Sequence, residues 1–201
     1  MKKYLLALIL IVSPLATAQT LPATDVGVWI SDSEYNDPSI TDEEGTLDAE
    51  VDENVGFGVS LNHFWLDSFS TELAYHQFGG DVDASFDGSP RFDAGEIDTQ
   101  TLTAIAQWHF RRASRFSPYV GAGAAFVTGE VDPGDGDVTV DLEDEFTWAA
   151  NFGANIALNE HWSIGLDAKF INWEPKAEND DASERVDLSP AVLSAGLKFR
   201  F

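Results

Sequence analysis

Hydrophobic and polar residues alternate along eight segments of the chain. Successive side chains of a β-strand point to opposite faces, so alternation gives each segment one apolar and one polar face. In the last segment Leu193 and Leu197 fall on one face, whereas Ser194 and Lys198 fall on the other. The predicted strands are Thr24–Ser33, Asn54–Phe64, Phe69–Phe78, Thr99–Phe110, Pro118–Thr128, Phe146–Leu158, Trp162–Trp173 and Ser189–Phe201. Their lengths are close to the about 9–11 residues that a tilted membrane strand requires.

The connections between these segments alternate in length. Those after the second, fourth and sixth segments are short: Trp65–Ser68, Arg111–Ser117 and Asn159–His161. The other four are much longer. Short turns on one rim and long loops on the other are typical of bacterial outer-membrane barrels, in which the short turns are periplasmic. The sequence therefore predicts an all-β fold, an eight-stranded antiparallel transmembrane up-and-down β-barrel.

The first eighteen residues have the composition of a secretory signal peptide. Lys2 and Lys3 precede an apolar stretch, and Ala16-Thr17-Ala18 provides small residues before Gln19. The apolar stretch is shorter than the about 20 residues of a membrane-spanning helix. We expect a cleaved signal peptide at 1–18 and a barrel domain at 19–201, exported to the cell outer membrane.

The charge is strongly negative and unevenly distributed. There are 35 acidic residues against 11 basic ones, so nucleic acid is excluded as a partner. Thirty of the acidic residues lie in four stretches, which are 32–53, 81–98, 130–145 and 174–187. These stretches are the long connections. The sequence thus predicts four long acidic extracellular loops.

A soluble barrel, such as a secreted lipocalin-like protein, also has one apolar and one polar face, and differs in which face points inward. Here the polar face carries charges of both signs, which can neutralise one another in a lumen but would each cost about 2–4 kcal/mol in mid-membrane lipid. Aromatic residues also collect near the strand ends, as in two interfacial girdles. One girdle is predicted from Trp65, Trp108, Phe110, Tyr119, Trp162, Phe199 and Phe201, the other from Tyr75, Phe126, Phe146, Trp148, Phe170 and Trp173. These features favour a membrane barrel.

Three segments resemble a known family. They are Ser117-Pro118-Tyr119-Val120-Gly121-Ala122-Gly123, the last strand from Leu188 to Phe201, and the stretch from Thr101 to Phe110. They resemble the OmpW family of small outer-membrane barrels and, less specifically, OmpX- and OmpA-like barrels. The resemblance implies a narrow apolar channel for small hydrophobic molecules. It also implies assembly by the outer-membrane insertion machinery, with Phe199 and Phe201 as the assembly signal, in a membrane of lipid and lipopolysaccharide.

The alternation and the strand directions divide the inward residues into two sets. Apolar channel-lining residues are predicted in the outer half: Trp29, Phe78, Ile105, Val127, Ile171 and Val192. A charged floor is predicted below them: Asp25, Glu72, Asp167, Lys169, Lys198 and Arg200. Asp25 should pair with Arg200, and Asp167 with Lys198.

An apolar mouth over a charged floor would admit a hydrophobic solute, which would leave sideways between strands. The alternative is that these apolar residues only fill a narrow barrel. The protein would then be a structural or adhesin-like barrel with a plugged lumen.

The sequence contains no convincing catalytic or metal-binding motif. A lipid A-modifying enzyme needs a serine beside a histidine, and His161-Trp162-Ser163 falls at a predicted periplasmic turn, away from that substrate. The acidic spacing from Asp132 to Asp137 resembles a calcium loop but lacks the closing glutamate. We predict no catalytic residue, no cofactor and no specific metal site.

Overall fold

The computed structural model describes residues 23–36, 39–41, 46–51, 55–86, 89–110, 114–132, 140–179, 182–185 and 187–201. The predicted signal peptide and the calcium-like spacing beyond Asp132 lie outside these residues. The strands are β1 (Thr24–Glu34), β2 (Ser39–Thr41), β3 (Thr46–Val51), β4 (Val55–Leu66), β5 (Phe69–Phe86), β6 (Phe92–His109), β7 (Phe116–Asp132), β8 (Val140–Asp141), β9 (Glu145–Ala157), β10 (Trp162–Ile171), β11 (Lys176–Asn179), β12 (Ala182–Arg185) and β13 (Ala191–Arg200). No helix within the described ranges is long and apolar enough to cross a membrane.

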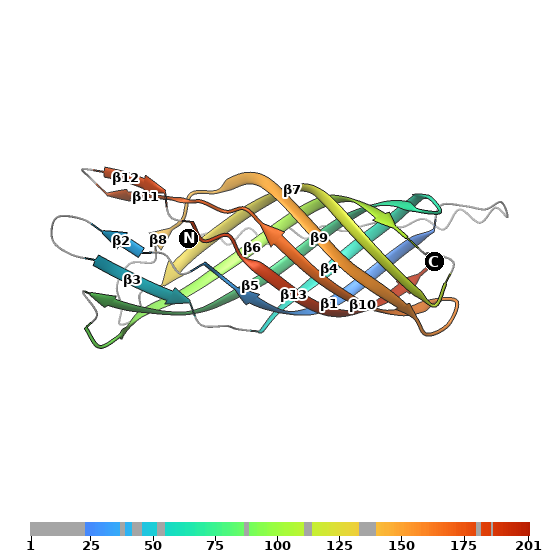
Figure 1. Ribbon diagram of the computed structural model, residues 1–201, viewed down its shortest axis with the longest axis horizontal. Coiled ribbons are helices and arrows are strands. Elements are labelled where there is room, and N and C mark those ends of the chain that lie inside the picture. The colour runs from blue at the N-terminus through green and yellow to red at the C-terminus, as the bar shows by residue number, and fades with distance from the viewer. Residues whose placement is uncertain are drawn as a thin grey trace, which may run out of the picture.

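Eight strands close into an antiparallel ring in the order β1-β4-β5-β6-β7-β9-β10-β13 (Figure 1). The last strand returns to the first, with Asp25 opposite Arg200 and Val28 opposite Leu197. Each ring strand overlaps one of the eight predicted segments. The predicted fold class is therefore confirmed.

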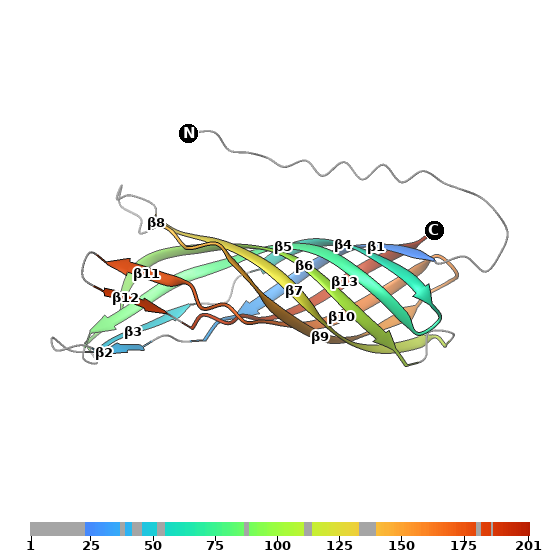
Figure 2. The ribbon, with the colours of Figure 1, turned by 90° about the horizontal axis from the view of Figure 1, so that it is seen from above.

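The strands of the long connections extend the barrel at one end, where β2, β3, β8, β11 and β12 gather, whereas the C-terminus lies at the other end (Figures 1 and 2). Most of the predicted loop 81–98 is instead strand, because β5 continues to Phe86 and β6 begins at Phe92. Asp81 pairs with Glu96 in the continuing ladder. A strand that projects beyond the lipid tolerates acidic residues on its faces.

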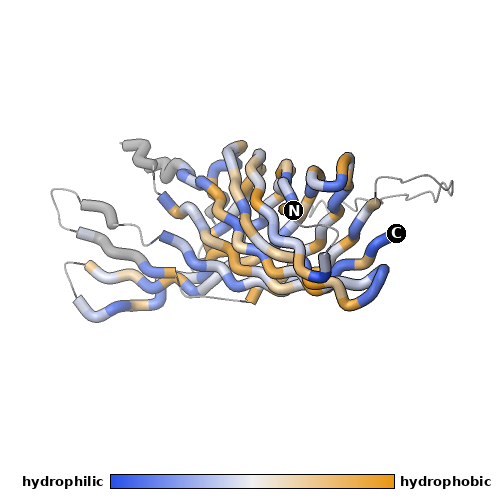
Figure 3. Tube along the Cα trace, turned by 45° about the vertical axis from the view of Figure 1, so that its right-hand side comes forward, coloured by the Kyte–Doolittle hydropathy of each residue, from blue (hydrophilic) through white to orange (hydrophobic). Residues whose placement is uncertain are grey.

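The two faces of the wall are inverted relative to a soluble barrel. On the outer face, Val28 is 56% exposed and Ile30 is 65% exposed. Inward residues such as Asn62, Glu72 and Gln107 are buried and polar. Figure 3 shows the resulting alternation of hydrophilic and hydrophobic residues along the strands. An apolar outer face requires lipid around it, so the structure excludes the soluble alternative.

Exposed aromatic side chains lie near both ends of the ring. Those nearer the short turns include Trp65, Trp108, Phe110, Phe116, Trp162 and Phe201. Two predicted girdle residues are instead buried, since Tyr119 is 1% exposed and Trp173 is 0% exposed. Tyr119 occupies an inward position opposite His109. Trp173 follows the end of β10 and packs inside the barrel.

Candidate functional site: the barrel interior

The outer half of the interior contains an apolar cluster, called here the outer cluster. Its buried members are Tyr35, Phe78, Ile97, Ile105, Ala125, Val127, Ala149, Ile171, Trp173, Leu188 and Val192. Five of the six predicted lining residues belong to it, the exception being Trp29. Tyr35 closes one side, because its hydroxyl donates to Thr99 Oγ1 at 2.8 Å. Burial raises the pKa of Tyr35 above the ordinary tyrosine value.

Trp29 lies apart from the outer cluster, and this corrects the sequence prediction. Its Nε1 donates to Ser60 Oγ at 2.8 Å. The indole lies against Gly165 and Gly196, which face each other on β10 and β13. A Cβ at either glycine would come within 2.5 Å of the ring. These two glycines therefore leave room for the indole to lie along the wall among polar side chains.

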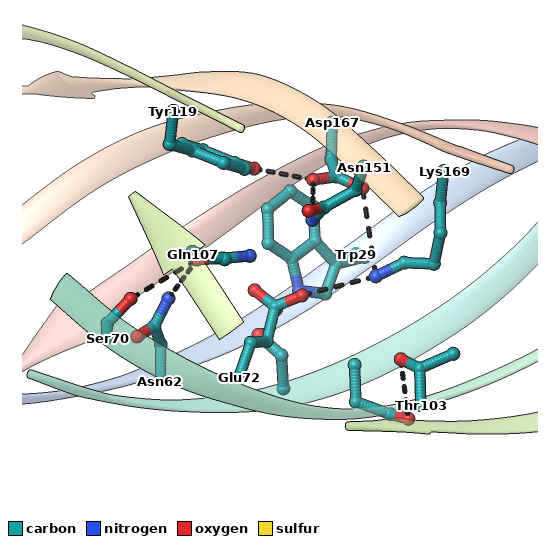
Figure 4. A network of polar contacts seen from close by, with 12 residues as sticks. Trp29, Asn62, Ser70, Glu72, Thr103, Gln107, Tyr119, Asn151, Asp167 and Lys169 are labelled. Carbon is teal, nitrogen blue, oxygen red and sulfur yellow. Dashed lines mark hydrogen bonds and ion pairs between the residues drawn. The ribbon is translucent and has the colours of Figure 1, made fainter. Parts of the chain in front are cut away.

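An ion pair crosses the lumen below the outer cluster (Figure 4). Lys169 Nζ on β10 lies 3.2 Å from Glu72 Oε1 on β5, and both side chains are 2% exposed. β5 and β10 occupy opposite sides of the ring. Asp167 Oδ2 lies 3.8 Å from the same ammonium. The charges of this pair therefore span the bore rather than running along one wall.

The predicted pair of Asp167 and Lys198 does not form. Asp167 Oδ1 instead accepts from Tyr119 Oη at 2.6 Å and from Asn151 Nδ2 at 2.8 Å. Lys198 Nζ lies 5.3 Å from the Trp29 ring centre and 5.9 Å from that of Tyr119. Two aromatic faces thus stabilise this ammonium by cation–π attraction.

A second polar layer lies nearer the short-turn end. Asn62 Nδ2 donates to Gln107 Oε1 at 2.6 Å, and Ser70 Oγ lies 2.9 Å from His109 Nε2. His109 is 1% exposed, so its ring lies inside the barrel. The buried Ser70–His109 pair was missed, although alternation along β5 and β6 places both residues inward.

The predicted pair of Asp25 and Arg200 is confirmed. Arg200 Nε and Nη2 each donate to one carboxylate oxygen of Asp25, both at 2.8 Å. This pair joins the first and last strands of the ring. Across the parts of the chain that the structure describes, no group of three or more His, Cys, Asp and Glu side chains is placed to hold a metal ion.

The outer cluster and the cross-lumen ion pair occupy neighbouring positions in the strand ladder. Glu72 is the Cα partner of Ile105, and Lys169 is the Cα partner of Val192. Each end of the ion pair therefore borders an apolar residue of the outer cluster. The interior is an apolar compartment that ends on a charged, hydrogen-bonded layer.

Comparisons with known proteins agree with this architecture. A family model described as the OmpW family matches residues 23–201. Outer membrane protein W of Vibrio cholerae is 31% identical over 166 residues, which cover 74% of this chain and 76% of that protein. Outer membrane protein AlkL of Ectopseudomonas oleovorans is 22% identical, covering 87% of this chain and 83% of that protein. The crystal structure of OprG from Pseudomonas aeruginosa superposes with a TM-score of 0.74 at 19% identity, covering 90% of this chain and 96% of that one. This chain belongs to the OmpW family and is an integral β-barrel of the outer membrane.

Proposed function

We propose that the barrel takes up small hydrophobic molecules across the outer membrane through the outer cluster. The observation that carries this proposal is the position of the Glu72–Lys169 pair, whose two residues are the Cα partners of Ile105 and Val192 of the outer cluster. Apolar side chains favour an apolar solute by removing its surface from water. The charged layer beneath disfavours further passage, since the solute would displace paired polar groups without replacing their bonds.

A solute stopped at this layer leaves sideways into the membrane. The outer surface of the wall supports this route with a groove of about 730 Å³ across β9, β10, β13 and β1. Phe152, Leu166 and Leu193 line it, and all three are exposed on the lipid side. Such a groove offers an apolar surface to a molecule that leaves the lumen between the strands.

Entry requires a part of the outer cluster to move, because its members are packed together. Tyr35 follows β1, Trp173 follows β10 and Leu188 precedes β13, so all three belong to connections rather than to ring strands. The Trp173 ring contacts Gly129, where a Cβ would lie 2.7 Å from it. We infer that these three side chains form the displaceable cover of the channel.

A structural or surface-interaction role is the second candidate. It is favoured by the complete burial of Ile105, Val127 and Trp173, each 0% exposed, which is expected of a plugged lumen. Hydrophobic uptake separates the two roles, because a plugged barrel would not accelerate it. Catalysis is not part of either proposal, and we expect none from the buried Ser70–His109 pair.

The test is a substitution in the outer cluster. Ile171→Asp should fold but should lose most uptake of an apolar tracer, since an ionised group in an apolar passage is costly to desolvate and binds such solutes poorly. Ile171→Leu, which retains apolar character, should keep uptake near that of the wild type. Tracer uptake by cells and ion conductance in planar bilayers are the measurements.

Conductance should stay low in the wild type and in both variants, because the Glu72–Lys169 pair still crosses the bore. Undiminished tracer uptake by a folded Ile171→Asp variant would shift the conclusion to the surface-interaction role.

A further inference from the structure

Several buried side chains in or beside the outer cluster have a polar atom with no hydrogen-bond partner, among them four residues on β1, β5, β6 and β13. The atoms of these four are Ser31 Oγ, His76 Nδ1, Thr101 Oγ1 and Ser194 Oγ. These residues are 5%, 3%, 1% and 7% exposed, respectively. We call them the polar wall.

The strand positions place two members of the polar wall, Thr101 and His76, among the apolar residues and on the outer side of Glu72. Thr101 lies between Ile97 and Ile105 on the inward face of β6. His76 lies two residues from Phe78 on β5, on the outer side of Glu72. Thus a solute in the outer cluster would meet these polar atoms before it met the charged layer.

The other two members form a pair on the seam that closes the ring. Ser31 and Ser194 are Cα partners on β1 and β13, and both side chains point inward. Ser194 lies two residues from Val192 of the outer cluster and opposite Asp167, so this pair lies where the outer cluster meets the charged layer. Hydroxyl groups therefore border the compartment on several strands.

Packing alone does not require these polar atoms. Valine has nearly the shape of threonine, and alanine would fill the positions of Ser31 and Ser194 without a hydroxyl group. A buried hydroxyl loses its bonds to water, so it is unfavourable until another group bonds to it. The polar wall is therefore poised to bond a molecule that enters.

We propose that the preferred solutes are neutral, largely apolar molecules that carry a hydroxyl or carbonyl group. The polar wall bonds that group while the outer cluster holds the apolar remainder. The solute is neutral because Glu72 and Lys169 already neutralise each other, so an ionised solute would stay unpaired in an apolar compartment. This inference rests on the proposed uptake function and names its solute class.

The test compares uptake of decane and of decanone, which have the same chain length, by cells that contain the full-length protein. Thr101→Val and the double variant Ser31→Ala, Ser194→Ala should each lower the decanone-to-decane uptake ratio by about three- to tenfold, as expected for one lost hydrogen bond. Thr103→Val is the matched control on the same face of β6. Its hydroxyl is already bonded to Ala74 O at 3.5 Å, so this variant should keep the wild-type ratio.

A second measurement is independent of uptake. The infrared carbonyl band of decanone bound to the purified wild-type barrel should lie at lower frequency than in Thr101→Val or in the double serine variant. An unchanged ratio and an unchanged band in these variants, with decane uptake intact, would overturn the inference. If the wild type takes up neither compound, the proposed uptake function fails, and the infrared band then decides whether the polar wall binds carbonyl groups.

Discussion

Lys169 is a buried cation whose stability depends on two carboxylates from different strands. Glu72 Oε1 lies 3.2 Å from its ammonium and Asp167 Oδ2 lies 3.8 Å from it. Removing water from such charges is costly, and the mutual attraction of the partners offsets that cost only while both are present. A single substitution should therefore be more harmful than removal of the whole pair.

At the scale of single residues, we predict that Lys169→Met lowers the free energy of unfolding by about 3–5 kcal/mol, because two buried carboxylates lose their shared cation. The double variant Glu72→Gln, Lys169→Met should lose clearly less, since only Asp167 then stays charged near the site. Urea unfolding of the purified barrel in micelles measures both values. Equal losses in the single and double variants would show that the two residues do not act as a pair.

At the scale of elements, the β5–β6 hairpin has an inner part within the ring and an outer part beyond it. β5 pairs with β4 only as far as Gln77, whereas the β5–β6 ladder continues to Ala84 opposite Phe92. Beyond the ring, β5 gains only the short strand β3 as a neighbour on its other side. The outer part therefore contributes little to barrel closure.

Replacing residues 81–96 with an Asn-Gly turn should leave a folded barrel. Gly80 and Ile97 are Cα partners, so the turn would join two positions that already face each other, and Asn-Gly favours such hairpins. Heat-modifiable migration in gels should match the wild type. Replacing 78–99 with the same turn is the control, and it should destabilise the barrel because it removes Phe78 from the outer cluster and Thr99 from its bond with Tyr35. Failure of the shorter replacement to fold would show that the outer hairpin is needed for closure.

At the scale of the whole molecule, the barrel is closed by pairing between its first and last strands. The terminal residue adds little to that pairing, because Phe201 is 65% exposed and makes one backbone bond, from its N–H to Thr24 O at 3.0 Å. Its ring also contacts Phe199 edge to face. The folded state thus depends weakly on Phe201, whereas the proposed assembly signal depends on it directly.

We therefore predict that deletion of Phe201 separates assembly from stability. Cells should contain less folded protein in the outer membrane, because the proposed assembly signal loses its terminal residue. Purified chains refolded in micelles should unfold at nearly the wild-type urea concentration. If cells that carry the deletion contain wild-type amounts of heat-modifiable protein, the proposed role of Phe201 in assembly is wrong.

The alternating pattern alone determined the eight ring strands, their inward faces and the pairing of the first strand with the last. Asp25 and Arg200 could be matched from sequence, because closure of the ring pairs its first strand with its last. Five of the six residues predicted to line the apolar compartment lie in the outer cluster for the same reason, since alternation decides which face each side chain occupies.

Contacts across the lumen were decided only by the tertiary structure. Lys169 and Glu72 are 97 residues apart, and their meeting depends on the stagger of the strands around the ring, which no local pattern encodes. The direction of Trp29 along the wall likewise depends on Gly165 and Gly196 of other strands. Alternation assigns a side chain to the interior, but its height and its partners there are set by strand tilt and by the residues that leave space for it.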